Sequence, residues 1–372
     1  FSDVSLADAG VWAYSEGEEF EILLFAYSFD FDPEVKVVDL AQGEKIPEDV
    51  VQALNDPNVI KHAYNAVFEI VCLNHAGYTT PPDQWRCTMF HALYLGYPAG
   101  LAKTGEALNL TAQDSKDRSG KALIRYFSVP CKPTQRNGNR TRNLPAHDPD
   151  KWALFKKYNQ QDVVAEMEIY KRLSTFPVPD KEQELWVLEQ DMHRYGIPVD
   201  LDFIYGALEL RQQQSEAELA EVTELTGLEN PKSRVQMQSW IEKELGHELP
   251  NFRKATVQEV LDNDPPPQVK RALEIWQNLS KTSLAKYDAF INSVAKDNRI
   301  HGAHQIDGAN RTGSWAGRLI QPQNLPRNYL PALSLAREYV KERDLKALEF
   351  TYGDLTDTLS QLIRTAIVPS EG

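Results

Sequence analysis

The stretch from Arg311 to Arg327, RTGSWAGRLIQPQNLPR, gathers three arginines and several amide side chains around glycines and contains no acidic residue. Guanidinium and amide N–H groups donate hydrogen bonds to phosphate oxygens and base edges, and glycine lets a main chain approach a strand closely. On the turn signals alone, an exposed loop without a ligand remains the alternative. The residue types predict contact with nucleic acid through Arg311, Arg318, Gln321, Gln323, Asn324 and Arg327.

Two shorter patterns place a carboxylate four residues after another polar side chain. Glu69 follows Asn65 in Asn65-Ala-Val-Phe68-Glu69, and Asp162 follows Tyr158 in Tyr158-Asn-Gln-Gln-Asp162. A spacing of four puts both members on one face of a helix, and carboxylate oxygens are ligands that Mg²⁺ prefers. Taken singly, the first pattern is also typical of a helix cap and the second of a solvated contact, so both alternatives stay open.

An α/β arrangement is predicted for the segments that must position these carboxylates. Apolar or alternating runs on either side of the turn Asp30-Phe-Asp-Pro33 predict a hairpin, and another strand precedes the first carboxylate. Gly77 is expected to end the helix that carries Glu69. The expected strands cover 20–27, 35–40 and 59–63, and the expected helices cover 67–76, 88–94 and 152–173.

The character of the chain changes after Phe176-Pro-Val-Pro179. Long charged stretches with heptad-like spacing predict helices over 181–195, 202–225 and 267–295. We therefore expect a domain boundary at Pro177 and Pro179, with an α/β domain before it and a mostly helical region after it.

Composition limits the kind of binding surface that the chain can have. With 372 residues, 42% of them hydrophobic, the chain can bury two or three cores. A net charge of -14 excludes an evenly basic, histone-like binder, so any nucleic-acid site must be local. The run from Lys116 to Arg142 holds eight Lys or Arg residues against Asp117 alone, which predicts either a solvated loop or a loop that holds single-stranded DNA.

Cysteine usage and hydropathy indicate an intracellular protein. Cys72, Cys87 and Cys131 show no CxxC spacing, so neither a disulfide framework nor a zinc site is indicated. No apolar run approaches the roughly 18 residues of a membrane span, and the first residues do not resemble a signal peptide. No membrane partner is expected.

Taken together and in this order, the motifs resemble those of bacteriophage-type family A DNA polymerases. The run from Trp315 to Pro326 resembles the primer-template contact region, with Ser314 in place of the family's usual basic residue. The patterns at Glu69 and Asp162 resemble the second and third motifs of DEDD-class 3′ to 5′ proofreading exonucleases, which often have Asp where this chain has Glu69. The resemblance implies three parts: a ribonuclease H-like α/β exonuclease domain at 1–178, a mostly helical thumb at 179–298, and a DNA-contacting segment with the start of a polymerase palm at 299–372.

The resemblance also implies roles for single residues. Asp162 and Glu69 would be metal ligands in a two-metal site for Mg²⁺ or Mn²⁺, which clamps the scissile phosphate, activates a water and stabilises the leaving oxygen. Tyr158 would orient the attacking water and complete the catalytic set. Asn65 and Phe68 would position the 3′ end of a single DNA strand.

The helical region resembles the family more diffusely. Asp191-Met-His-Arg-Tyr-Gly-Ile-Pro-Val-Asp200 resembles the join between exonuclease and thumb, and Asn230-Pro-Lys-Ser-Arg234 resembles the inner turn of the thumb. Ordinary helix packing is the alternative. On the first interpretation, contacts with the DNA backbone are expected from Lys232, Arg234, Lys281 and Lys286.

Two features predict that the enzymatic sites are incomplete in this chain. The Asp-x-Glu pair of the first exonuclease motif is not found, and Leu362-Ile-Arg-Thr-Ala-Ile-Val-Pro-Ser-Glu-Gly372 resembles the lead-in to the first palm strand, ahead of the catalytic aspartates. We therefore expect an incomplete two-metal site and no nucleotide incorporation by this chain alone. A full-length enzyme would use primer-template DNA and dNTPs to replicate and proofread DNA in the cytoplasm of a bacterial host.

Three alternatives stay open. The chain could be a catalytically decayed exonuclease-like module that binds DNA, or one subunit of a split polymerase. A stand-alone DEDD nuclease that acts on RNA is the third, and the segment from Arg311 to Arg327 disfavours it.

Overall fold

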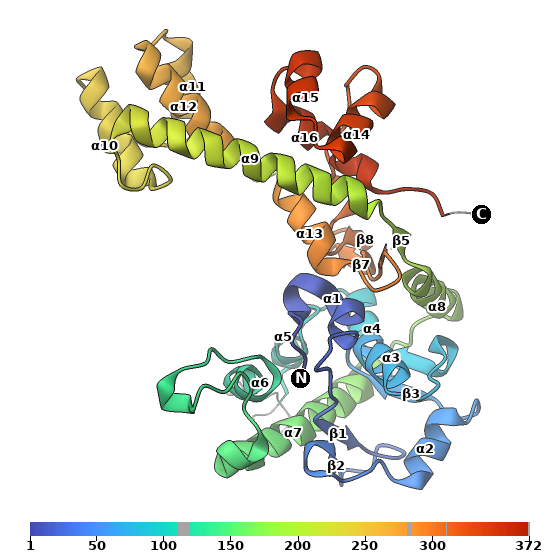
Figure 1. The fold of residues 1–372 in the computed structure, drawn as a ribbon. Coiled ribbons are helices and arrows are strands. Elements are labelled where there is room, and N and C mark those ends of the chain that lie inside the picture. Colours follow the sequence, from blue (N-terminus) through green and yellow to red (C-terminus); the bar gives the residue numbers. More distant parts are fainter. Residues whose placement is uncertain (111–119, 281–283, 310, 371–372) are drawn as a thin grey trace. The chain divides into compact units, whose positions relative to one another are not determined.

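A computed structural model describes residues 1–110, 120–280, 284–309 and 311–370. Internal contacts divide the chain into two compact units, one made of residues 1–198 and 292–324 and the other of residues 199–291 and 325–372 (Figure 1). Each unit is described by itself. None of the described helices is both long and apolar enough to cross a membrane.

The first unit contains the predicted hairpin and the long helix that packs on it. β1 (Leu24–Tyr27) pairs antiparallel with β2 (Lys36–Asp39), and α7 (Pro149–Leu173) packs against both strands (Figure 1). Asp148 caps α7 by accepting a hydrogen bond from the Lys151 amide at 3.1 Å, which satisfies one of the free N–H groups of the first turn. The Trp152 indole donates to the buried Asp39 carboxylate at 2.8 Å and joins the helix to β2. The predicted hairpin and helix are confirmed.

A short parallel unit carries the helix with the first predicted carboxylate. β3 (Lys61–Ala63) and β4 (Trp85–Cys87) pair in parallel, and α3 (Ala66–His75) forms the crossover that parallel strands require. The chain leaves α3 through Gly77, whose φ of 92° favours glycine, as predicted. α4 (Thr88–Tyr94) follows β4 and covers the predicted range.

The strands of the described residues form four separate two-stranded sheets. The chain is therefore mixed in structure and rich in helix, as the predicted α/β and helical parts require. A ribonuclease H-like topology for the first part remains a prediction, because these short sheets do not establish it. The remaining helices of the first unit are α1 (Leu6–Ser15), α2 (Glu48–Asn55), α5 (Leu101–Ala107) and α6 (Gly120–Ser128).

Helix α8 (Asp180–Tyr195) belongs to the first unit, although the sequence places a boundary before it. Its Trp186 is 2% exposed and joins the core formed by Ile70, Trp85 and Phe90. Two small ribbons complete the unit: β5 (Ile197–Pro198) with β6 (Arg299–Ile300), and β7 (His304–Ala309) with β8 (Ser314–Gly317). The boundary between the two units therefore falls after Pro198 and not at Pro177 and Pro179. The predicted parts at 1–178, 179–298 and 299–372 do not coincide with these units.

The second unit is helical, and its part from 199 to 291 lies within the region predicted to be mostly helical. α9 (Leu201–Thr226) is its long central helix, and α10 (Arg234–Leu245), α11 (Lys254–Asp262) and α12 (Pro267–Leu279) share one apolar core with its second half (Figure 1). Gly206 lets α14 (Leu333–Glu342) approach the first half, because a side chain there would meet the Val340 carbonyl. The other helices are α13 (Ala285–Ser293), α15 (Leu345–Tyr352) and α16 (Leu355–Leu362).

Candidate functional site

Helices α3 and α7 bring the two predicted carboxylates into electrostatic contact. Glu69 lies in the first turn of α3, and Asp162 lies in the middle of α7. Burial, with a smaller contribution from the negative charges of Glu166 and Asp162, raises the pKa of Glu69 to about 7. The two patterns, 93 residues apart along the chain, therefore form one acidic cluster together with Glu166.

Glu166 is a member of this cluster that the sequence analysis missed. It lies four residues after Asp162, on the same helix face, and is buried. The Thr88 hydroxyl donates to Glu166 Oε1 at 2.5 Å, and burial raises the pKa of this carboxyl to about 7. The spacing to Asp162 was the available signal, but an acidic residue on a long charged helix is usually solvated.

The cluster has the donor chemistry of a divalent metal site. Glu69 Oε2 is buried and accepts no hydrogen bond from any described residue, and its neighbours are acids that oppose its ionisation. Hard carboxylate oxygens fit Mg²⁺ or Mn²⁺. Within the described parts of the chain, however, no group of three or more His, Cys, Asp or Glu side chains is arranged to hold a metal ion. Glu69, Asp162 and Glu166 could thus supply part of a ligand set, and the two-metal site stays a prediction.

The neighbours of the carboxylates lie in different environments. Tyr158 is buried, its ring stacks on Phe155 with centroids 6.4 Å apart, and a side chain at Gly120 would overlap it. Asn65 precedes α3 and is exposed, and its side chain makes no capping hydrogen bond, so the simple cap alternative does not hold. The Phe68 ring packs near Tyr14, with centroids 6.2 Å apart. The roles given to Tyr158, Asn65 and Phe68 stay predictions.

Arg318 lies directly after β8, in the segment predicted to bind nucleic acid. Its backbone N–H donates to the Ala303 carbonyl at 2.8 Å, and its Nε donates to Gln305 Oε1 at 2.7 Å. Partial burial lowers the pKa of Arg318, although a guanidinium stays charged in proteins. This arginine is therefore held against the β7–β8 ribbon, whereas the sequence suggested a loop.

The other predicted residues of the segment are exposed. Asn324 donates to Gln321 Oε1 at 3.3 Å, and the Gln323 amide lies against Gly317, where a side chain would overlap it. Arg311 lies in the turn between β7 and β8, and Arg327 belongs to the second unit. Within the described parts of the chain, none of the three arginines forms an ion pair, so their charge is available to an anion.

Predicted backbone contacts in the second unit lie at the start of α10 and on α13. Lys232 and Arg234 are exposed on either side of Ser233, which caps α10 by accepting from the Gln236 amide. Lys286 is half-buried on α13. Lys281 lies outside the described residues. Two exposed cations at a helix start suit a phosphate backbone, because helix N-terminal N–H groups also attract anions.

The basic run of the first unit is built around a short turn in its described part. Cys131 N–H donates to the Thr141 carbonyl at 2.7 Å, and Thr134 and Asn137 form a reciprocal capping box. Exposed cations on this surface are Lys121, Arg125, Lys132 and Arg136. The two interpretations of this run, a solvated loop and a loop that holds single-stranded DNA, stay predictions.

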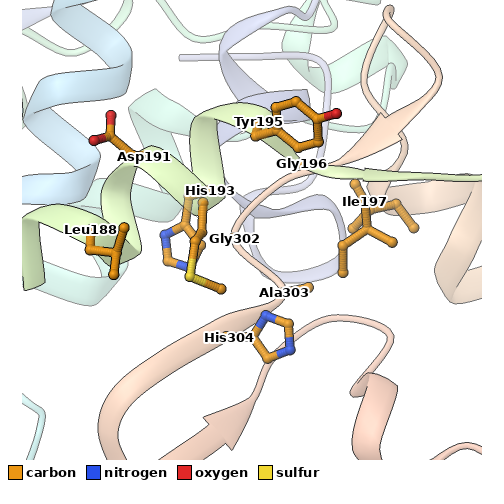
Figure 2. A pocket seen from close by; sticks show the side chains of 11 residues that line it. Leu188, Asp191, His193, Tyr195, Gly196, Ile197, Gly302, Ala303 and His304 are labelled. Carbon is orange, nitrogen blue, oxygen red and sulfur yellow. The ribbon is translucent and has the colours of Figure 1, made fainter. Parts of the chain in front are cut away.

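A cavity of about 370 Å³ lies in the first unit, between the end of α8 and the segment that leads into β7 (Figure 2). Apolar side chains such as Leu188, Met192 and Ile197 line much of it. Burial lowers the pKa of His193 to about 4, so this ring is neutral at pH 7, and burial also lowers the pKa of His304. None of the described residues that line the cavity is a lysine or an arginine.

Comparison with known proteins places these sites in context. No protein-family model matches the chain. Over 373 aligned positions, which include 100% of this chain, it is 48% identical to a protein of Bacillus phage SP02 described as a DNA polymerase. This chain is a homologue of a phage DNA polymerase. It spans 57% of the length of that relative.

Among solved structures, this chain has a partial likeness to the POL domain of Pol1 from M. smegmatis in complex with DNA primer-template and dNTP. The two share 18% sequence identity at a TM-score of 0.46, over 82% of this chain and 49% of the other.

Proposed function

We propose that this chain is part of a family A DNA polymerase and contains its proofreading exonuclease domain, its thumb and the beginning of its palm. The 48% identity to a phage DNA polymerase along the whole chain carries the proposal. The unpaired arginines from Arg311 to Arg327 and the carboxylates of α3 and α7 support it, because both match what a DNA strand and a 3′ end require.

In the proposed exonuclease site, Glu69 and Asp162 hold a divalent cation, Mg²⁺ or Mn²⁺. When bound, such ions activate water and stabilise the leaving oxygen of a phosphodiester. Asn65 and Phe68 position the 3′ end, and Tyr158 orients the attacking water. Glu166, fixed by Thr88, adds a buried carboxylate beside them.

In the proposed polymerase part, the chain binds primer-template DNA. Arg311, Arg318 and Arg327 neutralise phosphates, and amides such as Gln323 contact the strand or its bases. Lys232, Arg234, Lys281 and Lys286 add backbone contacts. The full-length enzyme adds dNTPs to a primer in the cytoplasm of a bacterial host.

A gel assay with an end-labelled primer-template, Mg²⁺ and dNTPs tests this proposal. The chain is expected to shift the labelled DNA without extending the primer. Templated extension would contradict the proposal that this chain lacks a working polymerase site, and the absence of a shifted band would contradict DNA binding. Any shortening of the primer should need Mg²⁺ and disappear in Asp162→Ala.

A second candidate function is a DNA-binding module without nuclease chemistry. The described residues favour it in one respect, because no three or more of their His, Cys, Asp or Glu side chains are arranged to hold a metal ion. Such a module binds DNA equally with Mg²⁺ or with EDTA and leaves the primer intact. Mg²⁺-dependent digestion that is lost in Asp162→Ala would exclude it.

A further inference from the structure

We propose that Gln305 is a positioning residue that orients the Arg318 guanidinium toward a DNA phosphate. This inference rests on the proposed function, in which Arg318 contacts DNA. Gln305 was not among the residues singled out from the sequence, because only the pairing of β7 with β8 brings it to Arg318.

The contact between the two side chains has one possible orientation. Gln305 pairs with Ala316 across the ribbon, and Arg318 follows two residues later, so both side chains lie on the same face of the ribbon. Arg318 Nε lies 2.7 Å from Gln305 Oε1. A guanidinium has no acceptor, so the oxygen of the amide must face it and the NH₂ group must point away.

That orientation leaves the amide nitrogen of Gln305 without a partner. Gln305 Nε2 is buried and makes no hydrogen bond to any described residue. A buried unsatisfied donor lowers stability, so an apolar side chain of similar size would suit the isolated fold at least as well. The role of the Gln305 amide is therefore to bind the Arg318 side chain, and not to pack the ribbon.

Gly317 and Gly308 also contact the Arg318 guanidinium, and some of its N–H donors stay without a protein acceptor among the described residues. Nη1 donates to the Gly317 carbonyl at 3.0 Å, and Nη2 lies against Gly308, where an added Cβ would be 3.0 Å away. An arginine has five N–H donors, and two of them are used within the described residues. The others keep the fork geometry that recognises phosphate.

The strand that carries Gln305 is itself anchored. Glu189 on α8 is 3% exposed, and its Oε1 accepts the backbone N–H of Ile306 at 2.5 Å. The Arg318 backbone is held from the other side by the Ala303 carbonyl. Both ends of the Gln305–Arg318 contact are therefore attached to fixed backbone, which is the requirement for orienting a flexible arginine.

A double-mutant cycle tests the inference. Affinity for a fluorescent primer-template is measured for the unmodified chain, Gln305→Leu, Arg318→Ala and the double variant. Each single change is expected to weaken binding about tenfold, the loss of one charge-assisted contact. The double variant is expected to bind no more weakly than Arg318→Ala. In all three variants the slope of log affinity against log salt should shrink by about one phosphate contact.

Two further variants keep the result interpretable. Gln52→Leu on the exposed face of α2 changes the same side chain away from the ribbon and should leave affinity unchanged. Gln305→Asn keeps an amide that is too short to reach Arg318, and it should lose affinity as Gln305→Leu does. The melting temperature of Gln305→Leu is expected to stay close to that of the unmodified chain, because the change removes the unsatisfied Gln305 donor but also the acceptor of the Arg318 Nε hydrogen bond.

The possible failures separate the inference from the proposed function. If Arg318→Ala leaves affinity and salt dependence unchanged, Arg318 does not contact DNA and the proposed function is wrong at this residue. If Arg318→Ala weakens binding while Gln305→Leu and Gln305→Asn do not, or if the two effects add, the positioning role of Gln305 is wrong and the proposed function stands.

Discussion

At the scale of the residue, burial opposes the ionisation of several carboxyl groups. Glu69, Glu166 and Glu189 all have pKa values raised to about 7, and burial is the largest cause for each. Glu189 stands apart from the proposed metal ligands and accepts hydrogen bonds from the Ile306 amide and from Gln190. Its protonation can therefore be tested through stability alone.

We predict that Glu189→Gln flattens the dependence of stability on pH. The unfolded carboxyl ionises near 4.5, whereas the folded one keeps its proton up to about 7. Between these values the folded state binds more protons, so stability falls as pH rises. The full pKa difference corresponds to at most about 3 kcal/mol in the free energy of unfolding. Gln keeps an oxygen acceptor for Ile306 without this dependence.

Thermal melting from pH 5 to pH 8 measures the effect. The curves of the unmodified chain and Glu189→Gln should diverge as pH rises, with the variant gaining in relative stability. The exposed Glu184→Gln on the same helix is the control and should follow the unmodified chain. Parallel curves for Glu189→Gln would mean that its ionisation is not coupled to folding.

At the scale of the element, several helices and the first hairpin could be predicted from the sequence, whereas the contacts between these elements could not. Helix α4 and the core of α7 lie where periodicity and turn residues placed them. The position of α8 depends on where Trp186 is buried, which proline and charge patterns do not reveal. The Gln305–Arg318 contact depends on a ribbon whose register shifts between Gln305 and Ala309, and no local pattern encodes that shift.

The acidic cluster shows the same division between local and long-range information. Helical spacing indicated that Asn65 and Glu69 share a face, and likewise Tyr158 and Asp162. That α3 and α7 meet was implied by the resemblance alone. The bond from Thr88 to Glu166 joins residues 78 apart and had no signal in the sequence.

We predict that Asp200→Ala destabilises the second unit by about 2–3 kcal/mol. Asp200 caps α9 by accepting from the Phe203 amide at 3.2 Å, and it also pairs with Arg337 and Lys341 of α14 at 2.6 and 2.8 Å. Partial burial raises the pKa of Asp200, but Lys341, the Phe203 amide and Arg337 outweigh it and lower the pKa overall. This contribution is present above pH 3.8 and is lost as pH falls below it.

Urea unfolding at pH 7 measures the change, with Asp202→Ala as the matched control. Asp202 also lies at the start of α9 and pairs with Arg343 at 2.7 Å, but its side chain is 59% exposed. An exposed ion pair contributes about 0–1 kcal/mol. Equal losses in the two variants would show that the partly buried ion pairs of Asp200 with α14 add nothing beyond a helix-end charge.

At the scale of the whole molecule, an acidic chain is proposed to bind a polyanion. The net charge of -14 repels DNA at long range, so binding must come from local arginines and lysines that make close contacts. Close phosphate contacts release counterions, which makes affinity strongly dependent on salt. The same net charge disfavours loose, sequence-independent coating of DNA.

The central claim is tested most directly by the affinity of this chain for a fluorescent primer-template, measured by anisotropy as salt is raised. The account predicts saturable binding at low salt and a linear fall of log affinity with log salt, with a slope of about 0.9 per phosphate neutralised. It also predicts a smaller slope for Arg318→Ala. No saturable binding at low salt, or binding that salt and Arg318→Ala leave unchanged, would contradict the account.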